Sequence, residues 1–192
     1  MAISQKTISK NYSGMSPTGI LVESDEIFKI TVTTSKTDEI ILKTKIDGET
    51  FETFEIKTSM EDSLLVIRTG RALGYKKIDD KLAAHKVMSV ELIIEMPQDK
   101  ELYIDSDLAS VALTGRFRFI NLNLLQGYAR LNHFRGSGTI NTKGGYVTAR
   151  VFETSVDART NNGKVIKEVL GNCPERLKIH SIDGNIAVFP LQ

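Results

Sequence analysis

A repeating pattern in the second half of the chain constrains the fold more than any other feature. One short unit recurs five times between residues 102 and 190, at steps of 18, 18, 18 and 21 residues. Its central small residues are Ala109, Gly127, Gly145, Gly163 and Gly184. Three positions earlier stand Ser106, Leu124, Thr142, Thr160 and Ser181. A unit this short cannot bury its own apolar face, so neighbouring copies must stack on one another.

Each unit consists of two alternating apolar and polar runs on either side of the small residue, as in two short strands joined by a turn. An 18-residue step with about three sides predicts a parallel β-solenoid. The predicted fold class is therefore all-β, a single-domain parallel β-solenoid (β-helix) with about 18-residue coils in the C-terminal half. We expect positive φ at the glycine column and hydroxyls that bridge neighbouring turns. A third inward-facing side is predicted at Phe134, Phe152 and Leu170, again 18 residues apart.

The first half of the chain is rich in strand-forming residues but lacks this regular spacing. Asp47-Gly48, between the runs 39–46 and 51–58, predicts a hairpin turn. Asp79 or Asp80 can cap a short helix near 79–86. The predicted organisation is one domain over 1–192, with irregular N-terminal strands (1–69), an excursion containing the helix (70–86) and regular repeats (87–192).

Composition and charge exclude several kinds of function. The 192-residue chain has a formal net charge of +1, so no overall positive field favours nucleic acid as a partner. The single cysteine, Cys173, excludes an intrachain disulfide and a cysteine-based metal site. The three histidines show no metal-ligating spacing, so neither a metal nor another cofactor is predicted. No apolar run approaches the roughly 18 residues needed to cross a bilayer, so no transmembrane segment is predicted.

No catalytic residue is predicted from the sequence. Cys173 has no histidine in its own segment, and the paired glycines lie between strand runs rather than before helices, unlike phosphate-binding loops. One outward column is interpreted as a polar ladder on a solvated face, with the members Asp105, Asn123, Asn141, Arg159 and His180. Acidic and basic side chains on neighbouring repeats leave a polysaccharide-acting enzyme, a lyase or a hydrolase, open as an alternative.

A second outward column suggests a ligand-binding surface. It contains Tyr128 and Tyr146 one repeat apart, with Lys164 next. Aromatic rings on a flat sheet can stack on sugar rings or on a partner's apolar surface. A ladder that only stabilises the sheet face is the alternative interpretation. The candidate ligand-binding residues are Tyr128, Tyr146, Arg130, Arg150 and Arg159.

The strand-rich first half, the proline-ended strand 90–97 and the repeats 139–147 (TINTKGGYV) and 178–188 (KIHSIDGNIAV) resemble a known family. This is the bacterial putative-adhesin β-solenoid family, which includes the head GIN domain and related domains of unknown function. The resemblance implies a single-domain β-solenoid, commonly found on exported or envelope-associated proteins, without catalytic residues. We therefore expect a non-enzymatic, adhesin-like binding or scaffold module of the cell envelope, whose partner is unknown, with a glycan and another envelope protein as the candidates. A cytosolic structural module stays open as an alternative. Unpaired strand edges at the ends of such a stack would allow self-association.

The first residues bear on location. Ala2 and Ser4, followed by Gln5, have the small-x-small spacing of a signal-peptidase site, although no apolar stretch precedes them. An exported protein, in the periplasm or on the cell surface, is therefore expected if Met1 is a late start. A cytoplasmic protein is expected otherwise.

Overall fold

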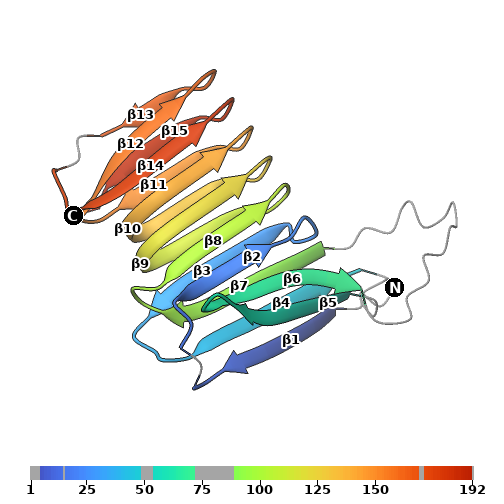
Figure 1. Cartoon of the computed structure of the whole chain (residues 1–192). Coiled ribbons are helices and arrows are strands. Elements are labelled where there is room, and N and C mark those ends of the chain that lie inside the picture. The colour runs from blue at the N-terminus through green and yellow to red at the C-terminus, as the bar shows by residue number, and fades with distance from the viewer. Residues whose placement is uncertain (1–4, 15, 49–53, 72–88, 169–170, 192) are drawn as a thin grey trace, which may run out of the picture.

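The part of the chain that the structure describes is built from strands. The computed structural model describes residues 5–14, 16–48, 54–71, 89–168 and 171–191. These residues form a mixed sheet of fifteen strands (Figure 1), so the all-β part of the prediction is confirmed. The strands are β1 (Gln5–Tyr12), β2 (Gly19–Glu23), β3 (Lys29–Ser35), β4 (Ile40–Asp47), β5 (Phe54–Glu61), β6 (Leu64–Arg71), β7 (Ser89–Pro97), β8 (Glu101–Ser106), β9 (Ser110–Leu124), β10 (Ala129–Thr142), β11 (Val147–Val151), β12 (Thr154–Thr160), β13 (Val165–Lys167), β14 (Glu175–Ser181) and β15 (Ile186–Pro190).

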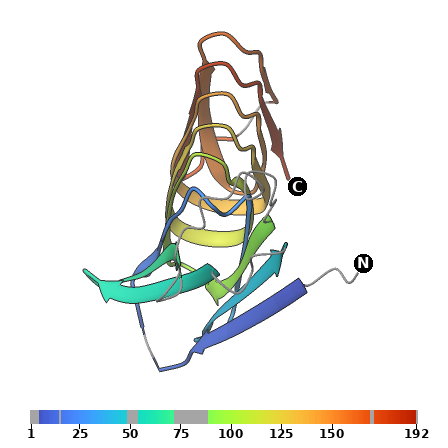
Figure 2. The same ribbon diagram turned by 90° about the vertical axis from the view of Figure 1, so that its right-hand side faces the viewer.

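The sheet is folded so that two ladders of strands face each other across the core (Figure 2). The first ladder has the order β1-β4-β7-β3-β9-β10-β11-β15-β13. The second ladder has the order β5-β6-β2-β8-β9-β10-β14-β12. With 15 and 14 residues, β9 and β10 are long enough to contribute to both ladders. Alternate residues of each strand point inward, and the two inner faces together form one apolar core.

The prediction of a parallel β-solenoid is wrong, because the sheet is mixed. Strand β4 pairs antiparallel with both β1 and β7, and β5 pairs antiparallel with β6. Strand β2 pairs parallel with β6 and β8, and β3 pairs parallel with β7 and β9. The pair β8–β9 and the pairs that follow it in the stack are also parallel. The first half of the sequence lacks the even spacing that brings successive strands into parallel register, and of its three antiparallel pairs only β5–β6 is joined by a short connection. The described residues contain no helix, and the helix predicted near 79–86 lies outside them.

The hairpin predicted at Asp47-Gly48 is also wrong, because β4 and β5 pair with other strands. The hairpin instead joins β5 to β6 through Asp62 and Ser63, which have φ values of 47° and 67°. Two consecutive positive φ values are typical of the type I′ turn, whose twist matches that of the paired strands. The turn therefore holds two non-glycine residues in a backbone conformation that glycine adopts more readily.

Replacing Ser63 with glycine is expected to raise the free energy of unfolding by about 0.5–1 kcal/mol, because glycine has no Cβ to clash at positive φ. Urea denaturation measures the change. The matched control is Ser59→Gly within β5, which should lower stability by about 0.5–1 kcal/mol because glycine weakens a strand interior. If both variants shift stability in the same direction, strain at the turn is not the cause.

The repeats stack in a different order from their order in the sequence. Val111, Ala129 and Val147 pair in register, as the 18-residue step predicts. The last repeat then lies between the third and the fourth, since β15 pairs with both β11 and β13 and β14 pairs with both β10 and β12. The fourth repeat therefore forms the end of the stack. Lys167 of this repeat occupies an inward-facing position, in register with Val188, and donates a hydrogen bond to the Val156 carbonyl of the other ladder.

The position of Lys167 gives a physical reason for this order. An inward lysine between two other repeats would be buried, which is costly without a paired charge. At the end of the stack its side chain can cross the open core and remain exposed, as it does here. An inward-pointing charge at a sheet edge also hinders the addition of another strand.

The central small residues of the repeats are needed for close approach rather than for positive φ. A Cβ added at Gly127 would lie 1.7 Å from the carbonyl oxygen of Ala109, and one at Gly145 would lie 1.8 Å from that of Gly127. None of the four repeat glycines is among the positive-φ residues of the described chain, so that part of the prediction is wrong. The turns of neighbouring repeats stack so tightly that only a hydrogen atom fits between them.

Hydroxyl groups hold these turns together, as predicted. The backbone N–H of Ala109 donates to Ser106 Oγ at 3.1 Å, and the N–H of Gly184 donates to Ser181 Oγ at 2.9 Å. Thr142 Oγ1 lies 2.9 Å from Ser181 Oγ in the neighbouring turn. Both hydroxyls are buried, so each bond satisfies a polar group that is shielded from water.

The predicted third side is only partly present. Phe134 is fully buried and stacks on Phe117, with ring centroids 5.7 Å apart, whereas Phe152 is 43% exposed. His133, with φ of 46°, lies in a register shift that places Phe134 opposite Val151. This extra residue in β10 turns Phe134 inward, whereas β11 keeps its regular alternation, with Val151 inward and Phe152 outward. Leu170 lies outside the described residues.

Candidate functional site

The two tyrosines of the predicted site stack on the outer face of the first ladder. Their ring centroids are 5.1 Å apart and the ring planes differ by 8°. The guanidinium carbon of Arg130 lies 5.6 Å from the centroid of Tyr128. Because β15 lies between β11 and β13, Asn185 rather than Lys164 lies next to Tyr146. The tyrosines therefore cover one face of each other's ring, which supports the interpretation that this column stabilises the sheet. Tyr146 is 44% exposed.

The remaining predicted site residues are divided between the two ladders. Arg150 lies on β11 of the first ladder, in register with Phe189 of β15, and is exposed. Arg159 lies on β12 of the second ladder, where its guanidinium forms an ion pair of 3.3 Å with Asp157. The structure thus groups Arg150 with the tyrosines and Arg130 on one outer face, and separates Arg159 from them. We call the first group, Tyr128, Tyr146, Arg130 and Arg150, the tyrosine–arginine face.

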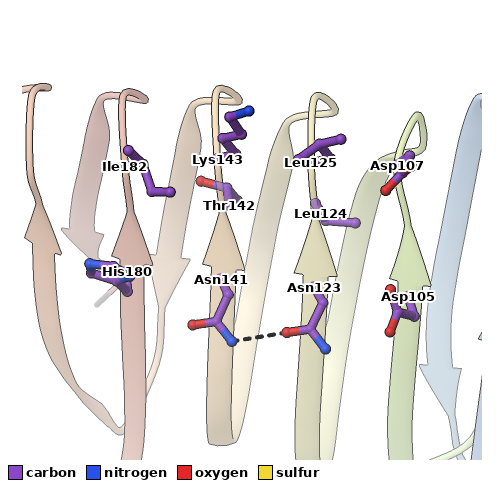
Figure 3. A pocket seen from close by; sticks show the side chains of 10 residues that line it. All are labelled: Asp105, Asp107, Asn123, Leu124, Leu125, Asn141, Thr142, Lys143, His180 and Ile182. Atoms are coloured by element: carbon purple, nitrogen blue, oxygen red, sulfur yellow. Dashed lines mark hydrogen bonds between the residues drawn. The ribbon is translucent and has the colours of Figure 1, made fainter.

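A row of polar side chains crosses the outer face of the second ladder. Asp105 pairs in register with Asn123, Asn123 with Asn141, and Asn141 with His180. Arg159 continues the row on β12. The Nδ2 group of Asn141 donates to Oδ1 of Asn123 at 2.9 Å (Figure 3). The predicted polar column is therefore confirmed, in the order of the strands in space.

A second outward row runs beside the first, nearer the turns. Together the two rows border a shallow groove of about 340 Å³ that crosses β8, β9, β10 and β14 (Figure 3). Leu124 and Thr142 also line the groove, between the rows. The second row consists of Asp107, Leu125, Lys143 and Ile182. We call these two rows and the space between them the ladder groove.

The repeat positions both rows by the same local geometry. Residues four and two places before each central small residue point to the same side of the strand, because side chains alternate with a period of two. The turn that follows is held by Thr142 in one repeat, whose hydroxyl donates to the Gly145 carbonyl at 3.1 Å, and by Ser181 in another. Sequence reasoning found the first row and missed the second. The period-two spacing was the signal that would have found Lys143 and its neighbours.

Charge changes sign along the ladder groove. Asp105 and Asp107 lie at the β8 end, and Lys143 and His180 lie towards the β14 end. The middle of the first row carries amides instead of charges. The groove therefore has no uniform field that would favour a strongly anionic or cationic ligand.

The row of polar residues continues beyond Asp105 into an ion-pair cluster. Glu23 pairs in register with Asp105 on one side and with Arg68 on the other. Arg68 contacts Glu23 and Glu61, each at 2.6 Å. The hydrogen bond from Arg68 lowers the pKa of the Glu61 carboxyl to about 2. Arg68 thus balances part of the negative charge of these two carboxylates.

The described residues hold no cluster of three or more histidine, cysteine or acidic side chains with metal-binding geometry. Cys173 is a free, partly exposed thiol, and its backbone N–H donates to Ser155 Oγ at 2.9 Å. Across the described ranges, the structure has no helix long and apolar enough to cross a membrane.

Comparison with known proteins identifies the fold. No protein-family model and no curated protein matches the chain, so no model assigns the head GIN domain to it. A solved structure of a putative cell adhesion protein from Clostridium sporogenes ATCC 15579 matches 98% of this chain and 100% of its own, with 14% identity and a TM-score of 0.64. That similarity shows a shared fold.

Two further solved structures match with lower scores. A putative adhesin from Bacteroides fragilis NCTC 9343 covers 98% of each chain with 15% identity and a TM-score of 0.36. A putative adhesin from Parabacteroides distasonis ATCC 8503 covers 95% of this chain and 97% of its own, with 15% identity and a TM-score of 0.34. These scores are too low to support a structural argument.

Proposed function

We propose that the protein is a non-enzymatic, adhesin-like binding module of the bacterial cell envelope. The observation that carries this proposal is the ladder groove, a shallow depression that repeats similar groups across four parallel strands. A rigid surface of this kind suits an extended ligand, because its side chains are positioned before the ligand binds. The fold shared with the putative cell adhesion protein of Clostridium sporogenes agrees with the proposal.

The surroundings of the groove carboxyls favour binding over hydrolysis. A glycosidase holds two carboxyl groups on either side of the scissile bond, in a site that excludes water. Asp105 and Asp107 are both exposed to solvent. His180, at the other end of the groove, lies three strand spacings from Asp105, or about 14 Å. This distance is too long for the two groups to act on one bond.

The proposal is tested by sedimentation of the purified full chain with insoluble envelope fractions from Gram-positive and Gram-negative bacteria. We expect the chain to sediment with at least one fraction and to release no reducing or unsaturated sugar from it. Serum albumin is the control for trapped protein. Absence of binding to every fraction contradicts the binding module, and release of sugar contradicts the absence of catalysis.

Variants on the two outer faces identify which one makes the contact. Tyr146→Ala combined with Arg150→Ala removes the tyrosine–arginine face. Asn123→Ala combined with Asn141→Ala removes the centre of the ladder groove. We expect the groove variant to reduce sedimentation with the envelope fraction more than the tyrosine–arginine variant, because the tyrosine rings are already partly covered by each other. The reverse result would assign binding to the first ladder.

A further inference from the structure

We propose that the ladder groove binds a linear, uncharged polysaccharide that lies across the strands, with its sugar units in register with successive strands. This inference rests on the proposed function and names the ligand class of the same surface. It follows from three properties of the groove: the period of its hydrogen-bonding groups, the alternation of its second row, and its charge.

The hydrogen-bonding groups repeat at the spacing of the strands. Asp105, Asn123, Asn141 and His180 lie in register on adjacent parallel strands, so successive groups are about 4.8 Å apart. The length that one pyranose unit adds to an extended chain is close to this spacing. A polymer that lies across the strands would therefore meet one polar side chain for each sugar unit.

The amides are oriented to bind hydroxyl groups. The bond between Asn141 Nδ2 and Asn123 Oδ1 fixes both side chains and uses one donor and one acceptor. Both Nδ2 hydrogens of Asn123 and the Oδ1 acceptor of Asn141 stay outside this bond, and they point along the row, toward the strands of Asp105 and His180 (Figure 3). Neighbouring sugar hydroxyls both donate and accept hydrogen bonds, and the pre-formed amide pair can meet them with little loss of side-chain entropy.

The second row supplies apolar contacts between its charges. Leu125 and Ile182 alternate with Asp107 and Lys143, and the side chain of Ile182 is 39% exposed. An exposed aliphatic side chain beside hydrogen-bonding groups suits the C–H face of a sugar ring, from which it displaces water. The two rows together offer polar contacts on one side of the chain and apolar contacts on the other.

The charges of the ladder groove exclude other linear polymers. A nucleic acid or an acidic polysaccharide would need several cations along its path, and it would meet the carboxylates of Asp105 and Asp107 at the β8 end. An extended peptide would bind best along a free strand edge, where its backbone can pair. The floor of the groove offers no such edge, because β8, β9, β10 and β14 already pair with each other. An uncharged glycan fits these restrictions.

The test measures binding of uncharged oligosaccharides to the full chain by isothermal titration calorimetry. The probes are cello-, chito-, laminari- and manno-oligosaccharides of two to six units. For at least one series, we expect affinity to rise with length until about four units, the number of strands that the groove crosses. Asn123→Ala and Asn141→Ala should each weaken this binding at least tenfold.

The matched control is Asn121→Ala. Asn121 lies on β9 two residues before Asn123, on the same outward face but outside the groove lining. Its replacement should leave affinity unchanged within twofold, and thermal unfolding confirms that all three variants are folded. The proposal is overturned if no uncharged series binds, if affinity does not depend on length, or if Asn121→Ala weakens binding as much as Asn141→Ala. Envelope binding that survives the groove variants overturns this inference alone, whereas absence of envelope binding overturns the proposed function.

Discussion

Replacing Gly145 with alanine is expected to lower the free energy of unfolding by at least about 3 kcal/mol, more than most single substitutions. The added Cβ would lie 1.8 Å from the carbonyl oxygen of Gly127 and 3.1 Å from that of Gln126. Both are backbone atoms within stacked turns, so relief of the clash must push two repeats apart. Separation of the repeats would break parallel pairs on both ladders, which explains the size of the effect.

The neighbouring residue offers a matched control. A Cβ added at Gly144 meets no atom closer than Leu125 O at 3.9 Å, and Gly144 is exposed. Gly144→Ala should therefore change stability by less than about 0.5 kcal/mol. Chemical denaturation followed by circular dichroism measures both variants. Equal losses in the two would mean that the turn needs glycine for backbone freedom at both positions, and that close approach at Gly145 is not the cause.

This pair also shows what the sequence could and could not reveal about the repeats. The 18-residue period identifies which residues share a column, because identical steps bring identical positions into register. It does not distinguish a glycine needed for positive φ from one needed for close approach, since both leave the same letter in the sequence. The distance from a Cβ added at Gly145 to the carbonyl oxygen of Gly127 shows that close approach is the reason for glycine there.

The order of the repeats is a property that periodicity alone could not predict. Five similar units can stack in several orders, and short connections favour the order of the sequence. The structure places the last unit inside the stack and the unit with Lys167 at its end. The inward position of Lys167 was visible in the sequence as a departure from the apolar pattern. It is a signal for an end position, because an exposed end is where such a residue is tolerated.

The sequence predicted only part of the candidate site, because periodicity shows which residues share a column but not where the surface is hollowed. The column that contains Asn123 and Asn141 follows from the period, but a groove exists only when two rows border a common depression. Its presence depends on the volumes of neighbouring side chains and on the turn geometry that places Lys143. The tyrosine–arginine face was predicted as one group, and the structure separates Arg159 from it because that residue belongs to the second ladder.

Replacing Phe134 with alanine is expected to lower the free energy of unfolding by about 3–5 kcal/mol. Its side chain is fully buried and its ring stacks on Phe117. Truncation removes this contact and leaves a cavity between repeats whose backbones are held by parallel pairing, so the surrounding structure can collapse only partly. The loss is measured by chemical denaturation at constant pH.

Phe152→Ala is the matched control, because Phe152 follows Phe134 by one repeat and would share its environment if the 18-residue period held throughout. The register shift at His133 brings only Phe134 inward, and Phe152, which follows the regular alternation of β11, is 43% exposed. We therefore expect a loss of less than about 1 kcal/mol for this variant. Comparable losses in the two variants would contradict the register shift. A large loss only at Phe134 would support a local bulge in β10 that moves one of two equivalent phenylalanines into the core.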